Sequence, residues 1–331
     1  MEDRMDRLVN LDFSGRGIEH LHRAARERAG KPLVLAAAEL LAAVPRGSVV
    51  VLATGSASRS WITTSVSEND GPAGAAVLAR ALVLGLDAVP VLVSEAALLG
   101  AVGGVVTAAG MCVVALEEAR RAGMPGGRLS TAVLRAYPTG EEEGRAAAVA
   151  ILDELRPAAV VAVERPGRND RGVYHNARGV DFGAGRARID ELFEEAARRG
   201  LPSVAVGDGG NEIGMGAVAE AVRDHVPYGD RCRCGCGGGI GAVTSADVLV
   251  TATCSNWGCY AVVACLAVLL GDLDLLHTSG QEELLLRRGV ELGLINSPGG
   301  RVDPNVDGIP LECHKAVVEL LRELAVRRAN R

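Results

Sequence analysis

Short, continuous runs of apolar residues recur along the chain and alternate with stretches of helical spacing. Val49–Ala53 is a run of the kind that is buried on both faces of a parallel sheet. The sequence predicts strands at 49–53, 89–93, 112–115, 159–163, 204–206 and 248–252, and helices at 74–86, 141–155, 259–270, 281–292 and 312–326. This alternation predicts an α/β fold, with a doubly wound, mostly parallel sheet and helices on both of its faces.

The first part of the chain has a different pattern. Ile18, Leu21 and Ala25 repeat at helical spacing, and a second helix is predicted over 33–44. We expect residues 1–46 to form a helical N-terminal arm with a structural role. No internal repeat or linker divides the remainder, so 47–331 is predicted to be a single α/β catalytic domain.

Composition limits the class of partner. The chain has 331 residues, 48% of them hydrophobic, which is enough to bury a large core. Its net charge of -6 argues against nucleic acid and favours a small molecule, while a homo-oligomer stays open. Eight cysteines without a disulfide framework, and an N-terminus without a signal or transit pattern, predict a reducing, cytoplasmic location.

Residues 96–116 carry no charge and are long enough to be weighed as a membrane span. Their side chains are mostly alanine, glycine and valine, which fit a buried helix, turn and strand equally well. We therefore expect no membrane association.

Polar loops follow the predicted strands. Thr54-Gly55, 164–167, 207–210 and 253–258 each come directly after an apolar run, and 203–216 is the most glycine-rich and acidic of these segments. Ligands of open α/β sheets bind at the carboxyl ends of the strands, so the loops should converge on one crevice. Aromatic residues lie in or beside these loops and are expected to form pocket walls: Trp61, Tyr174, Phe182, Trp257 and Tyr260.

Four of these blocks together resemble the carboxy-terminal catalytic module of the D-glutamate cyclase family. They are Thr54-Gly55 with 68–75, then 164–179, 207–216 and 255–261. The resemblance implies a lyase that converts D-glutamate to 5-oxo-D-proline with loss of water. It implies a crevice built for a small dicarboxylic amino acid.

Lactam formation requires an anionic carboxylate to be neutralised and protons to be moved. Arg168 and Arg178 are suited to gripping a carboxylate, with ion pairs to Glu164 or Asp170 as the structural alternative. The predicted catalytic residues are Asp208, Glu212, Arg168 and Tyr174.

Other loop residues are predicted to bind substrate. Ser255 and Asn256 open the helix after the last strand, where they would either cap the helix or present its N–H groups to the substrate α-carboxylate. The predicted substrate-binding set is Thr54, Gly55, Glu68, Asp70, Asn176, Arg178, Gly209, Gly210, Asn211, Ser255, Asn256 and Trp257.

Two metal interpretations stand beside these roles. Asp208 and Glu212, with Glu68 and Asp70, would suit Mg²⁺ or Mn²⁺ if they converge, although the pattern requires no cofactor. Zinc at Cys232, Cys234 and Cys236 is disfavoured, because C-x-C-x-C lacks a second pair in the sequence.

Single residues outside these sets receive weaker assignments. His175 is either a proton shuttle or a surface histidine. Asp303 and Asp307 are expected to form turns, with closure of the pocket as the lesser alternative.

Three other functions are weighed against the lyase. A Mg²⁺-dependent phosphohydrolase would need an Asp-x-Asp after the first strand, where Thr54-Gly55 stands. A dinucleotide oxidoreductase would need a G-x-G-x-x-G motif there. A non-catalytic amino-acid-binding protein would keep the arginines but would not need Asp208 or Glu212.

Overall fold

A parallel sheet lies at the centre of the computed structural model, which describes residues 1–13, 15–124 and 129–330. Within these residues the sheet has seven strands in the order β3-β4-β2-β1-β5-β6-β7, and every pairing is parallel. The strands are β1 Val49–Ala53, β2 Val89–Ser94, β3 Cys112–Val113, β4 Thr131–Ala136, β5 Ala159–Val163, β6 Ser203–Gly207 and β7 Val248–Thr251.

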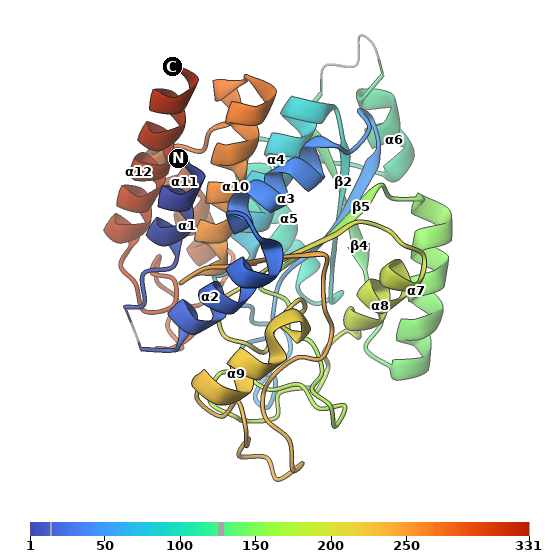
Figure 1. Ribbon diagram of the computed structural model, residues 1–331. Helices are drawn as coiled ribbons and strands as arrows, with labels where there is room; N and C mark the ends of the chain where they lie inside the picture. The colour runs from blue at the N-terminus through green and yellow to red at the C-terminus, as the bar shows by residue number, and fades with distance from the viewer. Residues whose placement is uncertain (14, 125–128, 331) are drawn as a thin grey trace.

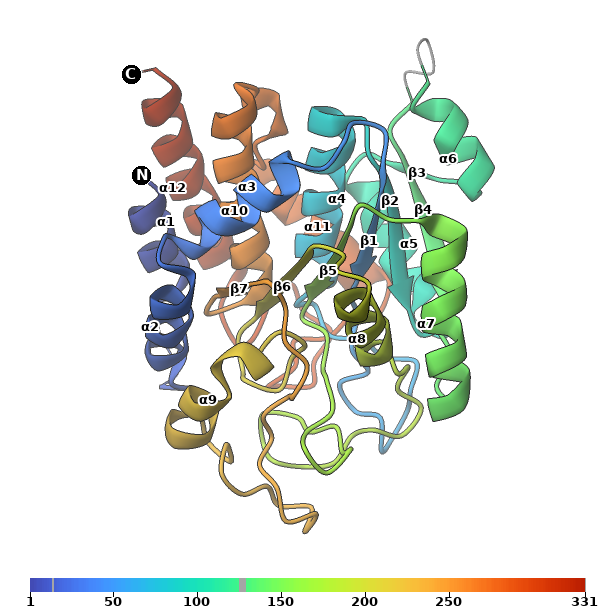
Figure 2. The ribbon, with the colours of Figure 1, turned by 45° about the vertical axis from the view of Figure 1, so that its right-hand side comes forward.

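Helices cover both faces of this sheet. In Figures 1 and 2, α7 and α8 lie on one side, and α1, α3, α10 and α12 on the other. The central strands β1, β5 and β6 are therefore buried along their whole length. The helices are α1 Glu2–Val9, α2 Ile18–Ala29, α3 Leu33–Ala42, α4 Pro72–Leu86, α5 Leu99–Ala108, α6 Leu116–Ala122, α7 Glu141–Leu155, α8 Asp190–Arg198, α9 Ala219–His225, α10 Ser255–Leu270, α11 Ser279–Glu291 and α12 Leu311–Ala329.

The predicted doubly wound α/β fold is confirmed, although single elements differ. All six predicted strands are present, whereas β4 was not predicted. The uncharged segment 96–116 contains α5, a turn and β3, which are the expected helix, turn and strand, although both residues of β3 are exposed. Among the described residues, no helix combines the length and the apolarity needed to cross a membrane.

The first three helices pack onto one edge of the sheet. Helices α2 and α3 contact β7, and α1 and α3 contact α10. The segment between α1 and α2 also carries Arg16 to the functional loops, where it donates a hydrogen bond to Asp208. The arm thus contributes a side chain that contacts Asp208, while its structural role and the division at residue 46 stay predictions.

The strand order fixes where a ligand can bind. The chain moves from β1 outward to β2 on one side, and later returns to place β5 on the other side of β1. The loops that leave β1 and β5 therefore diverge, which opens a crevice at their carboxyl ends. Long loops gather at this end together with α9, in the lower part of Figures 1 and 2.

Candidate active site

A cavity of about 370 Å³ lies at the carboxyl ends of β1, β5 and β6. Its size suits a small ligand. It is lined by Arg16, Ser56, Ser58, Arg59, Glu68, Glu164, Pro166, Asn176, Ala177, Arg178, Phe182, Asp208, Asn211, Glu212, Ser297, Pro298 and Asp307.

Segments far apart in the sequence meet at this cavity. Ser56 follows β1, Glu164 follows β5 and Asp208 follows β6, so three neighbouring strands each contribute from their carboxyl ends. Ser297 and Asp307 come from the segment between α11 and α12. Three of the four loops predicted to converge on one crevice, those after β1, β5 and β6, therefore contribute to its lining, whereas none of residues 253–258 does.

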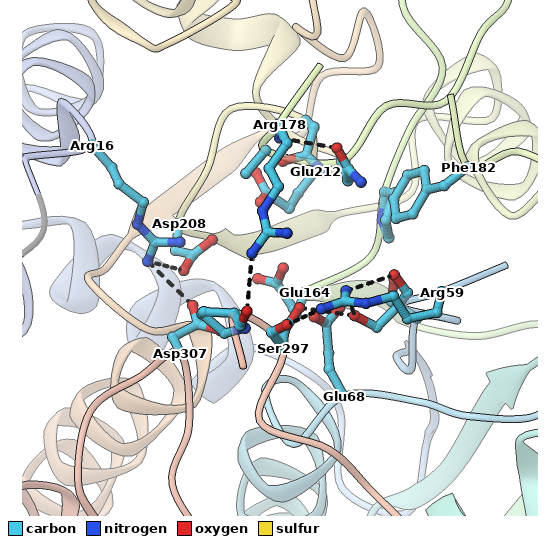
Figure 3. Close-up of a pocket in the computed structure, with 17 residues that line it drawn as sticks. Arg16, Arg59, Glu68, Glu164, Arg178, Phe182, Asp208, Glu212, Ser297 and Asp307 are labelled. Carbon is cyan, nitrogen blue, oxygen red and sulfur yellow. Dashed lines mark hydrogen bonds and ion pairs between the residues drawn. The ribbon is translucent and has the colours of Figure 1, made fainter. Parts of the chain in front are cut away.

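Carboxyl groups crowd one side of the cavity. One carboxylate oxygen from each of Glu164, Asp208 and Glu212 lies within 4.8 Å of the other two, and the same holds for Asp70, Asp208 and Asp307. Asp208 belongs to both groups and is the centre of the cluster. Figure 3 shows Asp208 with Arg16 at one side of the cavity and Arg59 at the other.

Burial and mutual repulsion shift the protonation of these groups. Burial raises the pKa of Asp208 to about 7, although the Arg16 guanidinium opposes this shift. Burial and the charge of Asp307 raise the pKa of Glu68 to about 7. Burial, with the charges of Asp208 and Glu212, raises the pKa of Glu164 well above its ordinary value. Near neutral pH the cluster therefore contains both protonated and ionised carboxyl groups.

Arg16 is the cation that sits inside this cluster. Its Nη2 atom lies 2.7 Å from Asp208 Oδ2 and 3.2 Å from Asp307 Oδ2, and it also donates to the Thr253 carbonyl at 2.9 Å. Asp307 therefore lines the cavity, which was the lesser alternative in the sequence. Nothing in the local sequence of Arg16 marks it, because its partner Asp208 lies 192 residues away.

Glu212 is held by the loop that carries it. Its carboxylate accepts the Gly209 N–H at 3.0 Å and the Gly210 N–H at 2.8 Å. The two glycines thus orient a carboxylate from behind, and neither lines the cavity. Asn211 lines it, and its Nδ2 atom donates to the His175 carbonyl at 2.9 Å.

Glu164 was not predicted as a site residue. It is the first residue after β5 and adopts a left-handed backbone conformation with φ of 48°. Such strained positions are concentrated at functional sites. Its Oε2 atom accepts a hydrogen bond of 2.5 Å from the Ser255 hydroxyl. Glu164 could have been predicted as a site residue because it is the first polar residue after a central strand.

Asp70 and Asn256 connect two helix N-termini below the cavity. The Asp70 carboxylate accepts the N–H groups of Ser255 and Asn256 at 2.8 and 2.9 Å. The side-chain oxygen of Asn256, Oδ1, accepts hydrogen bonds from the N–H groups of Gly71 and Gly74 at 3.1 and 2.6 Å. The N–H groups expected to receive a substrate carboxylate are thus occupied by Asp70, and none of Asp70, Ser255 and Asn256 is in the lining.

Arg168 and Tyr174 lie outside the cavity lining. Arg168 pairs with Asp190 and Glu194, at 2.7 Å in each case, and the Tyr174 hydroxyl donates to Asp190 at 2.5 Å. Arg168 therefore forms ion pairs, which was the structural alternative considered in the sequence, although its partners are not Glu164 and Asp170. These residues hold the wall of the cavity from behind.

Arg59 and Arg178 line the cavity and have no carboxylate partner among the described residues. Arg178 Nη2 donates to the Pro298 carbonyl at 2.9 Å, and Arg59 Nη2 donates to the Ser297 carbonyl at 2.6 Å. Both guanidinium groups therefore retain donors and charge for an anionic ligand. Arg178 was predicted as a site residue, and Arg59 was not.

Of the other predicted residues, Glu68 and Asn176 line the cavity, whereas Thr54, Gly55 and Trp257 surround it without lining it. Thr54 is fully buried after β1, and the Gly55 carbonyl accepts from the Arg165 guanidinium at 2.6 Å. Trp257 is fully buried and donates to His314 Nδ1 at 2.7 Å. Of the five aromatic residues expected to form pocket walls, the lining includes Phe182. The others fill the core or, as Trp61 does, face solvent.

Together these features define an α/β protein with a small, acidic, arginine-lined site at the switch point of a parallel sheet. Residues 5–322 match the family described as D-glutamate cyclase-like, C-terminal, and the chain belongs to that family. It is 35% identical over 188 residues to human D-glutamate cyclase, mitochondrial. That match covers 50% of this chain and 29% of the length of the human protein.

Proposed function

We propose that this chain is a lyase that converts D-glutamate into 5-oxo-D-proline and water. The observation that carries the proposal is the cluster of Glu164, Asp208 and Glu212, whose carboxyl groups have raised pKa values and face a cavity with two unpaired arginines. Membership of the D-glutamate cyclase-like family supports the same reaction.

The reaction is a transfer of two protons combined with one substitution. The substrate α-ammonium group loses two of its three protons as its nitrogen bonds to the side-chain carboxyl carbon. One oxygen of that carboxylate gains both protons and leaves as water. A catalyst therefore needs a proton acceptor near the nitrogen and a proton donor near the oxygen.

Asp208 and Glu164 suit these two tasks. Asp208 has a pKa of about 7 and is paired with Arg16, so it is partly ionised at neutral pH and can take a proton from the ammonium group. Burial and the charges of Asp208 and Glu212 raise the pKa of Glu164 well above its ordinary value, which favours the protonated form that can donate to the departing oxygen. The charge of Glu212 helps to raise both pKa values.

Arg59 and Arg178 provide for the substrate's two carboxylates. Held by carbonyl oxygens, their guanidinium groups can each grip a carboxylate through charge-assisted hydrogen bonds. One contact would neutralise the side-chain carboxylate before attack, and the other would fix the α-carboxylate. This arrangement brings the nitrogen toward the side-chain carbon, which is the proximity that ring closure needs.

A divalent cation is an alternative source of positive charge. The oxygens of Glu164, Asp208 and Glu212 are close enough to share one hard cation such as Mg²⁺ or Mn²⁺. Arg16 already pairs with Asp208, so the proposed proton transfers do not require the ion.

The test is incubation of the purified chain with D-glutamate, L-glutamate or 5-oxo-D-proline, each with and without EDTA, followed by chiral mass spectrometry. We expect 5-oxo-D-proline from D-glutamate and little product from L-glutamate. Loss of activity with EDTA, restored by Mg²⁺ or Mn²⁺, would assign the cation. Binding of D-glutamate without turnover would contradict the proposal and favour an amino-acid-binding protein.

A further inference from the structure

Four potential metal ligands meet behind one wall of the cavity. They are Cys232, Cys234 and Cys236 from the loop before β7, and His175 from the loop after β5. Their sulfur and nitrogen ligand atoms all lie within 4.8 Å of one another. In the sequence the three cysteines lacked a fourth ligand, because His175 lies more than fifty residues earlier in the chain.

The distances fit one centre. The Cys232 sulfur lies 3.3 Å from that of Cys234 and 3.4 Å from that of Cys236, and His175 Nε2 lies 3.2 and 3.8 Å from the sulfurs of Cys234 and Cys236. Tetrahedral zinc with Zn–S bonds of about 2.3 Å separates its sulfur ligands by roughly 3.8 Å. Small outward movements of the cysteines would therefore accommodate the ion.

The loop is shaped so that alternate cysteines face the same point. Gly235 and Gly237 have positive φ values of 82° and 84°, which turn the chain after Cys234 and after Cys236. Asn169 supports the turn by donating to the Gly239 carbonyl at 2.8 Å, and its Nδ2 atom lies 3.5 Å from the Cys236 sulfur. Such a donor commonly supports a metal-bound thiolate.

Charge and the burial of His175 and Cys232 agree with this geometry, while Cys234 is exposed and Cys236 is half-buried. His175 is fully buried and directs Nε2 toward the cysteines, so it is not the surface histidine weighed in the sequence. Three thiolates and one Zn²⁺ carry a net charge of −1, and the same loop contains Arg231 and Arg233. Soft sulfur ligands with one imidazole favour zinc over Mg²⁺ or Mn²⁺.

We propose that His175, Cys232, Cys234 and Cys236 bind a structural zinc ion. The protein supplies all four ligands, which is the pattern of a closed structural site and not of a catalytic one. The ion would fasten the loop before β7 to the loop that carries Asn176 and Arg178, whose side chains line the cavity. An existing backbone bond joins the same loops, from the Arg233 N–H to the Gly179 carbonyl at 2.8 Å.

The first measurement is the metal content of the full chain, purified without chelators and analysed by plasma mass spectrometry. We expect about one zinc ion per chain, as for a closed four-ligand site. Cys232→Ser and Cys236→Ser should each lose most of the zinc. The matched control Cys313→Ser, at an exposed cysteine on α12, should retain it.

A second measurement remains decisive if the cysteine variants fail to fold. Wild-type protein exchanged with Co²⁺ should show thiolate-to-cobalt charge-transfer absorption and the intense visible bands of a tetrahedral site. Wild-type protein without bound zinc and without these bands, or with a disulfide between Cys232 and Cys234, would overturn the proposal. Neither readout depends on cyclase activity, so the zinc site and the proposed reaction can fail separately.

Discussion

At the scale of single residues, the site is defined by carboxyl groups that are buried close together. Isolated charges of this kind are costly to bury, and the protein offsets the cost by protonation and by the ion pairs that Arg16 forms with Asp208 and Asp307. Arg59 and Arg178 add positive charge that the described carboxylates do not neutralise. We infer that an anionic substrate pairs with these two guanidinium groups and neutralises their charge.

Replacing Arg178 should weaken substrate binding more than it slows the chemical step. In Arg178→Gln a charge-assisted hydrogen bond of about 1.5–3 kcal/mol is lost, which corresponds to a rise in KM of roughly 10- to 100-fold. Steady-state kinetics with D-glutamate measure this effect. The control Arg171→Gln changes an exposed arginine of the same loop and should leave KM unchanged. Equal KM values for both variants would exclude Arg178 from substrate binding.

At the scale of elements, the floor of the site depends on two helix N-termini that cap each other. Asp70, before α4, accepts N–H groups at the start of α10, and Asn256, in α10, accepts N–H groups at the start of α4. Gly74 permits this approach, because a Cβ atom there would lie 2.8 Å from Asn256 Cα. The reciprocal caps therefore fix how α4 and α10 present the adjoining loops.

Removing one of these caps should destabilise the fold. Asn256→Ala leaves the buried Gly74 N–H group without an acceptor, whereas the Gly71 N–H group keeps Asp70 Oδ1 at 3.0 Å, so the free energy of unfolding should fall by about 1–3 kcal/mol. Urea denaturation followed by circular dichroism measures the loss. Asn330→Ala, at the exposed end of α12, should change stability by less than about 0.5 kcal/mol. A similar small change in Asn256→Ala would contradict the capping role.

The sequence predicted the elements whose pattern is local and strong. The central strands are continuous apolar runs, and α7 was predicted with its observed limits at Glu141 and Leu155. Strand β4 was missed because Arg135 interrupts a short run at a half-exposed part of the sheet. Predictions were weakest where a short polar element depends on its neighbours for burial.

The prediction of site residues also succeeded where the local sequence pattern was strong and failed where a contact depends on distant segments. Asp208 and Glu212 were predicted because they lie in a glycine-rich loop at a strand end, and both line the cavity. Arg168 was placed with the site because it shares a loop with Arg178, yet Asp190 and Glu194 pair with it. Contacts between distant segments, such as those of Arg16 or of the His175 imidazole, cannot be predicted from the residues next to them in the sequence.

At the scale of the whole molecule, the N-terminal helices and the sheet complete one site together. Helices α2 and α3 pack against β7, and this packing holds the segment with Arg16 across the loop after β6. The charge that lowers the pKa of Asp208 therefore comes from a part of the chain outside the predicted catalytic domain.

Removing that charge should shift the pH dependence of the reaction. Asp208 must be ionised to accept a proton, so kcat/KM should rise with pH through its pKa of about 7. In Arg16→Gln the pKa of Asp208 should increase, moving the rising limb to higher pH by about one unit or more. The control Arg28→Gln, at an exposed position of α2, should keep the wild-type profile. If kcat/KM of Arg16→Gln rises over the same pH range as that of wild type, Arg16 has no influence on the proton transfer by Asp208.

The most direct test of the site is the rate at which Asp208→Asn forms 5-oxo-D-proline from D-glutamate. The amide keeps the size of the side chain but cannot accept the ammonium proton, so kcat should fall by about 100-fold or more. The control Asp224→Asn, on the exposed face of α9, should turn over at the wild-type rate. A folded Asp208→Asn protein with a rate near that of wild type would contradict the proposed active site.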